Sequence, residues 1–487
     1  MKDLNKLFYP ESIAIVGASE NMLKWGSFVL VNIIDGNYKG KIFPIARNKD
    51  TIYGMKAYRS LLDIDENIDV AIIMLPSSVV QEILIDCEKK GIKNVVLVTS
   101  GFSEVGKEGR LLEEKLAEYA NEKGINIVGP NTMGITNTKC KLYATGAFTK
   151  PKAGGISIIA QSGNLGTQIM QWAEAQNIGI SKFAGSGNEA VLTCEDYLEY
   201  LQNDDDTSVI LMYLEGVNDG NKFFDLAKKT TAKKPVIALK AGRTDIGSKA
   251  AQSHTGAIAG SYKIFETVMK QTGITIAQSP TDLLFLAAAF DSMPPPKGNR
   301  VGVITLGGGW GVITADECIE RGMVLPPLPK NVYDTVDNLL PSFWSKGNPV
   351  DLVGQVDTEL FTVVIEAMMS SGAYDAIVFP GVVGTMGLGI KIFKASTRMG
   401  SGSEKELNDL IKLFKGVQNN FLDNIIDLMG KYQVPLYPVA ISTEPGDEII
   451  HSKNGGKNKL VIYNSPEEAV LCLEKQYHYS RYLNNQE

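Results

Sequence analysis

Short runs of β-branched and apolar residues alternate with amphipathic stretches along most of the chain. In the first third, the strand-like runs lie at residues 12–18, 41–46, 69–75, 94–100 and 125–129. Between them, residues 79–91 and 109–124 have helical periodicity and close on a glycine, which favours a helix C-terminus. Strands that alternate with helices in this way predict a doubly wound α/β unit with a parallel sheet.

The same alternation restarts twice further along the chain. After a break at Lys150, Pro151 and residues 154–155, further strands are predicted at 155–160, 180–185, 208–215, 235–242 and 274–277. After the stiff polar segment 293–298, a third set is predicted at 300–306, 375–381, 434–441 and 461–464. We therefore expect three α/β domains in series, at residues 1–150, 151–293 and 298–487.

Composition and charge exclude several classes of protein. The chain is 44% hydrophobic and 21% charged, which is typical of a folded α/β protein and excludes a disordered or fibrous one. Its net charge of −7 makes it a poor candidate for nucleic-acid binding. The longest apolar runs, such as 283–290, fall far short of the ~20 residues that a membrane span needs. The N-terminus does not resemble a signal peptide. We expect a cytoplasmic protein that binds neither nucleic acid nor membranes.

The five cysteines are scattered, with no CxxC pair and no histidine at the spacing of metal ligands: Cys87, Cys140, Cys194, Cys318 and Cys472. This pattern favours reduced thiols over disulfides or a zinc site. We expect no metal site on this chain.

Two segments of the first predicted domain are candidates for binding a phosphorylated ligand. The first strand runs into the glycine-rich turn 17–26, where backbone N–H groups and a helix N-terminus suit a phosphate, although GxGxxG is absent. After the second strand the chain reads Arg47-Asn48-Lys49, where an enzyme that binds NAD would carry an acidic residue. Basic residues there fit the extra ribose phosphate of coenzyme A or of NADP. A plain turn with solvated side chains is the alternative.

In the second predicted domain, two loops share one design. Residues 161–166 and 185–189 each follow a strand, open a helix, and combine small residues with Ser or Asn side chains. Such loops can hold an anion, although they also occur as plain turns. Because both lie at the C-terminal ends of strands, together they predict one shared phosphate site.

His254 lies among small residues, in the segment 248–260, which offers no bulky side chains for a histidine of the core. A neutral imidazole in such a loop suits nucleophilic attack on phosphorus near pH 7. Glu215 ends a predicted strand and could fix the histidine tautomer through the second ring nitrogen, but spacing alone leaves that pairing open. His451 and His478 lie in polar segments, and the sequence indicates no function for either.

Taken in order, these motifs resemble the α subunit of NDP-forming (ADP-forming) acyl-CoA synthetases, which are related to the succinyl-CoA synthetase α subunit. The strings that carry the resemblance are GAS at 17–19, VTSGFSE at 98–104, IVGPNTMGI at 127–135, AQSGNLG at 160–166, YLEG at 213–216 and SHTGAIAG at 253–260. The resemblance covers nearly the whole chain. It implies a Rossmann-like CoA-binding domain followed by two flavodoxin-like, doubly wound domains, the first of which carries the phosphohistidine.

The resemblance also implies a reaction: acyl-CoA + ADP + phosphate ⇌ carboxylic acid + CoA + ATP, through an acyl phosphate and a phosphohistidine. By match to the motifs, His254 is the phosphorylated residue and Glu215 its stabilising carboxylate. The phosphate and acyl group would be bound by Ser162, Gly163, Asn164, Gly187 and Asn188. Coenzyme A would be bound by Gly17, Ser19, Lys24, Lys49, Pro76, Val98, Thr99 and Ser100.

The nucleotide site of the family is an ATP-grasp module, which is not among the predicted domains. The resemblance therefore implies an ATP-grasp β subunit that holds ADP or ATP with Mg, in an α2β2 heterotetramer. The chain departs from the family pattern at Arg47-Asn48, at Val191, where an acidic residue is frequent, and at Trp310. The sequence therefore does not identify the acyl group of the substrate.

Two other functions are compatible with parts of the sequence. A CoA-binding sensor or scaffold could keep the fold without turnover, although the presence of both His254 and Glu215 argues against it. An NADP-linked oxidoreductase is disfavoured by the missing GxGxxG and by the phosphate-transfer loop.

Overall fold

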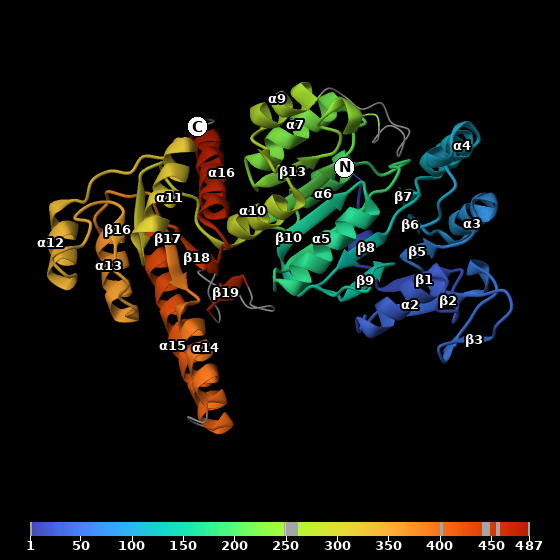
Figure 1. Ribbon diagram of the computed structural model, residues 1–487. Coiled ribbons are helices and arrows are strands. Elements are labelled where there is room, and N and C mark those ends of the chain that lie inside the picture. The colour runs from blue at the N-terminus through green and yellow to red at the C-terminus, as the bar shows by residue number, and fades with distance from the viewer. Residues whose placement is uncertain are drawn as a thin grey trace. The chain divides into compact units, whose positions relative to one another are not determined.

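The computed structural model describes residues 2–247, 249, 262–399, 403–440, 449–453 and 458–485. The chain divides into two compact units, Met1–Ala287 and Ala288–Glu487, and each is described here by itself (Figure 1). Of the predicted site residues, His254 lies outside the described residues.

The first unit contains a five-stranded parallel sheet in the order β2-β1-β5-β6-β7, which confirms the strands predicted there. The strands are β1 (Ser12–Val16), β2 (Lys41–Ile45), β5 (Val70–Ile73), β6 (Asn94–Leu97) and β7 (Asn126–Val128). Every residue of β1, β5 and β6 is buried, as expected for a parallel sheet covered on both faces. The helices between the strands are α2 (Trp25–Asp35), α3 (Ser77–Lys90) and α4 (Lys107–Lys123).

A second sheet of the same unit has seven strands in the order β14-β13-β12-β10-β11-β8-β9. Its parallel strands are β10 (Ala153–Ala160), β11 (Ile180–Gly185), β12 (Val209–Leu214), β13 (Val236–Lys240) and β14 (Thr275–Ile276). Its helices are α5 (Gly163–Ala175), α6 (Cys194–Leu201), α7 (Gly220–Thr231), α9 (Tyr262–Thr272) and α10 (Pro280–Ser292), the last of which runs on into the second unit.

The sequence pattern did not predict two strands of this second sheet, β8 (Gly134–Asn137) and β9 (Leu142–Thr145). They belong to the stretch predicted as the first domain, yet β8 pairs antiparallel with β11. These strands contain buried polar side chains whose hydrogen-bond partners lie far away in the sequence. For example, Asn137 Nδ2 donates to the carbonyl of Phe8 at 2.9 Å. Contacts of this kind leave no apolar alternation for a sequence pattern to detect.

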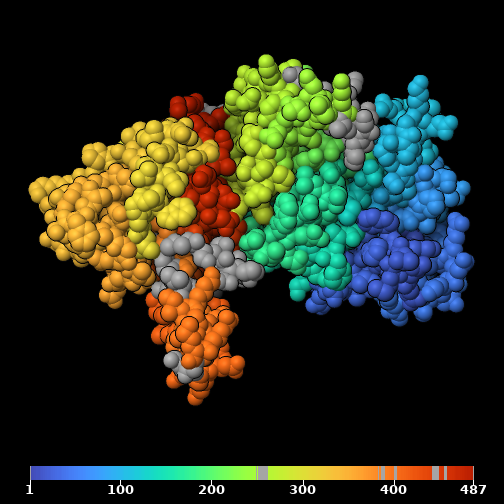
Figure 2. Space-filling view, viewed as in Figure 1, coloured from blue at the N-terminus to red at the C-terminus, as the bar shows by residue number. Residues whose placement is uncertain are grey.

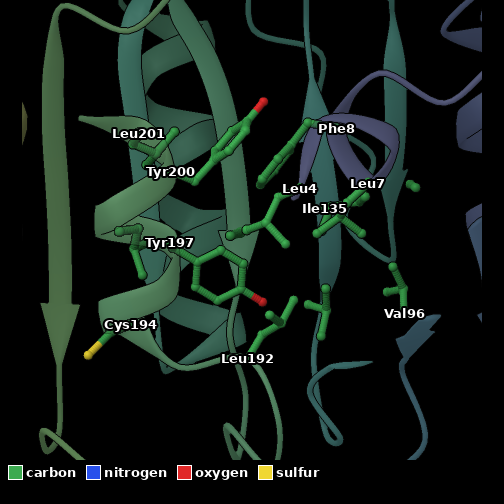
Figure 3. Packing of buried hydrophobic residues seen from close by; sticks show 14 of the residues in the cluster. Leu4, Leu7, Phe8, Val96, Ile135, Leu192, Cys194, Tyr197, Tyr200 and Leu201 are labelled. Atoms are coloured by element: carbon green, nitrogen blue, oxygen red, sulfur yellow. The ribbon is translucent and has the colours of Figure 1, made fainter. Parts of the chain in front are cut away.

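The N-terminal residues join the two sheets through one hydrophobic cluster (Figure 3). The short helix α1 (Asn5–Phe8) places Phe8 against Tyr200 of α6, with stacked rings whose centroids are 5.3 Å apart. Figure 3 shows Leu4 and Tyr197 in the same cluster. The cluster also includes Val96 of the first sheet and Ile135 of the second. The first unit is therefore held together by apolar contacts between its two sheets.

The second unit is built on a four-stranded parallel sheet in the order β16-β15-β17-β18. Its strands are β15 (Val301–Thr305), β16 (Val350–Asp351), β17 (Ala376–Val383) and β18 (Leu436–Ala440). Its helices are α11 (Gly308–Glu320), α12 (Lys330–Leu339), α13 (Thr358–Ser370), α14 (Thr385–Arg398), α15 (Glu404–Tyr432) and α16 (Pro466–Asn484). Figures 1 and 2 show α14 and α15 as a helical pair that extends away from this sheet.

The strand predicted at 461–464 differs in the structure. Strand β20 (Lys459–Val461) pairs antiparallel with β19 (Ile450–Ser452), and Tyr463 forms only an isolated bridge to Val439. Within the part of the chain that the structure describes, no helix combines the length and apolar character that crossing a membrane requires.

Candidate functional site

The turn after β1 lies at the edge of the first sheet and is built on two glycines. Gly17 has a φ of +94°, and a Cβ there would lie 2.8 Å from the carbonyl oxygen of Met74, past the end of β5. A Cβ on Gly26 would lie 2.0 Å from the Gly17 oxygen. The turn is therefore pressed against both a neighbouring strand and the first turn of α2, and only glycine fits at either place. Backbone N–H groups at such a helix N-terminus suit a phosphate.

The other residues predicted to bind CoA gather around this turn. Lys24 is the N-cap residue of α2, and Pro76 is that of α3. Val98 to Ser100 follow β6, where Thr99 Oγ1 donates to the carbonyl of Leu75 at 2.7 Å. These residues thus lie at the carboxyl ends of β1, β5 and β6, which are neighbours in the sheet. In an open α/β sheet this edge is where ligands bind, near the point where the strand order reverses.

Lys49 and Ser19 both contact residues of the same turn. Lys49 forms an ion pair with Glu20, and this contact lowers the pKa of Glu20 from its usual value. Ser19 Oγ accepts from the N–H of Asn21 at 3.1 Å. The structure therefore brings the predicted CoA residues together at one edge of the first sheet.

The first predicted anion loop forms the N-terminus of α5, at the carboxyl end of β10. Ser162 is the N-cap residue, and its Oγ accepts from the N–H of Leu165 at 3.5 Å. Gly163 begins the helix, and a Cβ on it would lie 2.4 Å from Cγ of Met133. Asn164 is exposed in the first turn. The N-terminal end of this helix carries a partial positive charge and offers unpaired N–H groups to an anion.

Glu215 lies directly after β12, next to β10 in the sheet, and only 9% of it is exposed. Its main-chain N–H donates to Oε1 of Gln161, the residue before Ser162. Its carbonyl oxygen accepts from Nζ of Lys240, at the end of β13, at 2.6 Å. The sequence motifs indicated Glu215 and placed Gln161 in the first anion loop, whereas Lys240 and the contacts of both side chains with Glu215 were missed because they depend on pairing between strands.

His254 belongs to the segment that follows β13. Residue Lys240 at the end of β13 pairs in register with Leu214, the residue before Glu215. The chain toward His254 therefore leaves the sheet one strand away from Glu215, at the same edge.

The second predicted anion loop has a different arrangement around Asn188. Gly187 has a φ of +62°, and a Cβ there would lie 2.3 Å from the carbonyl oxygen of Pro130. The Asn188 side chain contacts two acidic residues that follow β6, Glu104 in a 3-10 turn and Glu113 in α4: its Nδ2 lies 2.8 Å from Oε2 of each. This amide thus joins two parts of the unit, a role that the sequence did not predict for it.

Two buried carboxyl groups, Glu189 at the end of this loop and Glu195 in α6, have contacts that the sequence did not predict. Glu189 accepts from Nδ2 of Asn218 at 3.0 Å, and Glu195 accepts from the backbone N–H groups of Asn218 and Asp219 at 3.1 and 2.9 Å. Both side chains therefore hold the segment just after Glu215. Burial raises the pKa of Glu189 to about 8, so this carboxyl is mainly protonated at neutral pH.

Glu189, Cys194 and Glu195 each place one ligand atom within 4.8 Å of the others. One oxygen of each carboxyl group accepts hydrogen bonds: Oε2 of Glu189 from Nδ2 of Asn218, and Oε1 of Glu195 from the backbone N–H groups of Asn218 and Asp219. Burial also raises the pKa of the Cys194 thiol well above its usual value, which disfavours the thiolate that binds metals.

Val191 and Trp310, where the sequence departs from the family pattern, lie in different environments. Val191 is buried in an apolar cluster with residues of the first sheet, such as Leu97 and Ile127. Trp310 lies in the first turn of α11 and is 38% exposed.

Three family models match the chain in succession. They describe a CoA binding domain at residues 11–138, a succinyl-CoA ligase like flavodoxin domain at 153–290 and a ligase-CoA domain at 301–385. The α subunit of ADP-forming acetate–CoA ligase II from Pyrococcus furiosus is 37% identical over 470 residues, which cover 96% of each chain. The chain belongs to the family of ADP-forming acetate–CoA ligase α subunits. This confirms the family predicted from the motifs.

Other relatives of this family extend the comparison. The ADP-forming acetate–CoA ligase of Methanocaldococcus jannaschii is 43% identical over 73% of the chain, which matches 50% of that relative's length. Acetyl-coenzyme A synthetase 1 of Ca. Korarchaeum cryptofilum, solved with phosphate and ADP, has a TM-score of 0.84 at 32% identity and covers 100% of this chain and 99% of its own. The predicted α/β fold class is thereby confirmed.

Proposed function

We propose that this chain is the catalytic α subunit of an ADP-forming acyl-CoA synthetase, and that its histidine, His254, carries the phosphoryl group. The observation that supports this best is the meeting of the α5 N-terminus and the buried Glu215 at one edge of the second sheet. An anion site beside a buried carboxylate is what a phosphohistidine needs: one group to hold phosphate and another to orient the ring.

The first chemical step takes place on the thioester. CoA lies along the edge of the first sheet, near Gly17 and Thr99, and phosphate lies at the N-terminus of α5, near Ser162. A phosphate oxygen attacks the acyl carbonyl carbon, the C–S bond breaks, and the thiolate of CoA leaves. The product is an acyl phosphate. The α5 N–H groups stabilise the negative charge throughout this step.

The second step moves the phosphoryl group to the protein. A ring nitrogen of His254 attacks the phosphorus, the bond from phosphorus to the acyl oxygen breaks, and the carboxylate leaves. The Glu215 carboxylate accepts a hydrogen bond from the N–H of the other ring nitrogen. This bond stabilises the positive charge that forms on the ring. The phosphoryl group then passes from His254 to ADP.

The nucleotide step requires a second polypeptide. We propose an ATP-grasp β subunit that binds ADP with Mg, in an α2β2 complex. The support for a partner is that the P. furiosus relative, which this chain matches over 96% of its length, is named as a subunit. The acyl group that is transferred comes from a small carboxylic acid.

Phosphorylation of the purified chain tests the proposal. The chain is incubated with radiolabelled phosphate and each of a panel of acyl-CoAs, beside His254→Ala and Glu215→Gln. We expect acid-labile, alkali-stable label on the wild type, none on His254→Ala and much less on Glu215→Gln. The matched control is His451→Ala, because His451 lies in the second unit and pairs with Asp423 at 2.8 Å. The thioester that gives most label identifies the acyl class.

The phosphoryl label separates this proposal from a sensor without turnover, and CoA binding, measured by calorimetry, shows that a chain without label is still folded and able to bind. An active ligase and a sensor both bind CoA, and His254→Ala is expected to bind it normally. Absence of label with every thioester, also when a β subunit and ATP are supplied, would leave the sensor as the better account.

A further inference from the structure

The end of strand β12 is held in an unusual way. The regular ladder finishes with the N–H of Gln161 donating to the Tyr213 carbonyl at 3.2 Å, and with the N–H of Ala241 donating to the Leu214 carbonyl at 2.9 Å. Beyond these bonds, the chain bends at Glu215. Side chains at the ends of the two flanking strands contact the four main-chain polar groups of Glu215 and Gly216.

On the β10 side, the terminal amide of Gln161 serves three of these groups. Its Oε1 accepts from the N–H of Glu215 and from the N–H of Gly216, the latter at 3.0 Å. Its Nε2 donates to the Gly216 carbonyl at 3.0 Å. An amide has one oxygen with two lone pairs and an NH2 group, so a single glutamine side chain satisfies all three.

On the β13 side, Lys240 serves the fourth. Its Nζ donates to the carbonyl oxygen of Glu215 at 2.6 Å and to that of Ala241 at 2.8 Å. The lysine is only 7% exposed, and burial lowers the pKa of its ammonium group. Taking an ammonium group out of water is costly. The nearby Glu215 carboxylate opposes the effect of burial and favours the charged form.

We propose that Gln161 and Lys240 form a clamp that positions Glu215, and are thus positioning residues for the phosphohistidine step. The inference rests on the role proposed above for Glu215. With the peptide groups on both sides of its Cα fixed, the carboxylate can move only by rotation about its side-chain bonds. Small errors in the position of a group that orients a reacting side chain reduce rates strongly. Loosening the peptide should therefore weaken the hold of Glu215 on the imidazole.

The chain provides a matched control at the other end of β13. Lys234, just before β13, is half-buried, and burial lowers the pKa of its ammonium group. Its Nζ donates to the carbonyls of Leu201 and Asp204 at 2.9 and 2.5 Å. Lys234→Met therefore removes the same kind of contact as Lys240→Met, but at the opposite edge of the sheet. Gln168, exposed on α5, is the control for Gln161.

Two measurements on the full chain test the clamp. The first is hydrogen exchange at the amides of residues 215 and 216 in Gln161→Met, Lys240→Met, Lys234→Met and Gln168→Met. The second is the half-life of the acid-labile label after acyl-CoA and phosphate are removed. We expect both clamp variants to exchange faster at 215 and 216 and to lose label faster than the wild type, because a less firmly held Glu215 stabilises the phosphohistidine less. The two control variants should match the wild type. Gln161→Glu keeps an acceptor for the two N–H groups and should be intermediate.

Each outcome decides one point. Unchanged exchange in the clamp variants, or an equal effect of Lys234→Met, overturns the clamp. Faster exchange with an unchanged half-life of the label overturns the positioning role. If the wild type takes no label, the phosphohistidine proposal fails, while hydrogen exchange still decides whether the clamp exists. If Lys240→Met does not fold, Gln161→Met and Gln161→Glu carry both measurements.

Discussion

The side-chain amide of Asn188 donates to the Glu104 carboxylate at 2.8 Å, and this hydrogen bond joins the loop after β11 to the 3-10 turn Ser103–Val105 after β6. Burial raises the pKa of Glu104, but the hydrogen bonds from Asn188 and from the N–H of Gly101 outweigh it and hold the pKa below its usual value. Asn188 also lies against Glu113 of α4, at 2.8 Å. One amide therefore stabilises two carboxylates that would otherwise repel each other.

Asn188→Ala should accordingly lower the free energy of unfolding of the first unit, by about 1–2 kcal/mol, because two half-buried charged acceptors lose their donor. Asn188→Asp should cost more, since it adds a third carboxylate to the pair. Urea unfolding measures both, with Asn121→Ala on the exposed face of α4 as the control. Unchanged stability of Asn188→Ala together with loss of phosphate-dependent label would instead support the phosphate-binding role indicated by the motif.

The pH dependence of stability should carry the signature of Glu189. Its pKa rises from 4.5 to about 8 on folding, so between these values the native state keeps a proton that the unfolded state has lost. Stability from this group is complete below about pH 4.5 and is lost as pH rises through about 8. Each unit of pKa shift corresponds to about 1.4 kcal/mol, so the total is several kcal/mol.

Glu189→Gln mimics the protonated carboxyl and should remove this trend. We expect the stability of the wild type, relative to Glu189→Gln, to decline between pH 5.5 and pH 8.5 in urea unfolding. Glu114→Gln, at an exposed position of α4, should run parallel to the wild type over the same range. Parallel curves for Glu189→Gln and the wild type would show that Glu189 is ionised in the native state.

The strands were predictable where burial on both faces dictates composition. In β5 every residue is Val, Ile or Ala and is buried, so the sequence alone marks it. Strand β8 was not predicted because its buried Thr136 and Asn137 are residue types that are common in loops, and their distant partners are not visible in the local sequence. Burial of a polar residue depends on which other segments reach it, and that information is not local.

The same distinction applies to the site. Gly17 and Ser162 were predictable because a turn and a helix cap are local structures with their own residue preferences. Gln161 and Lys240 flank Glu215 only because β10, β12 and β13 are neighbours in the sheet. The order of strands in the sheet, which follows from packing, is what makes these two side chains partners.

The turn after β1, at residues 17–26, provides a further prediction. Gly17→Ala should weaken CoA binding by more than tenfold, because its φ is positive and the new Cβ would press on the Met74 carbonyl. Calorimetric titration with CoA measures the change. Gly91→Ala is the matched control: Gly91 also has a positive φ, +77°, but a Cβ there meets nothing within 4 Å. It should lose stability and keep its affinity for CoA. An equal loss of affinity in both variants would show that backbone strain alone, and not the close approach at Gly17, is responsible.

Breaking the buried ion pair beneath the N-terminal segment should destabilise the protein strongly. Lys182 of β11 and Asp204 are 1% and 7% exposed in their side chains, and Nζ lies 2.7 Å from Oδ2. The ring of Tyr9 lies over the same ammonium group, with its centroid 4.8 Å from Nζ. Removing one member of a buried pair leaves the other charge without compensation, at a cost of about 3–5 kcal/mol.

Lys182→Met should therefore lower the unfolding free energy of the first unit by about this amount. Replacing both partners, in Lys182→Met with Asp204→Leu, should recover most of the loss, since no lone buried charge remains. The exposed pair Lys270–Glu266, at 3.0 Å, is the control, and Lys270→Met should cost less than about 1 kcal/mol. Urea unfolding of all three variants decides the point. If the double variant is no more stable than Lys182→Met, the loss comes from the apolar stem and the Tyr9 contact, and the ion pair itself contributes little.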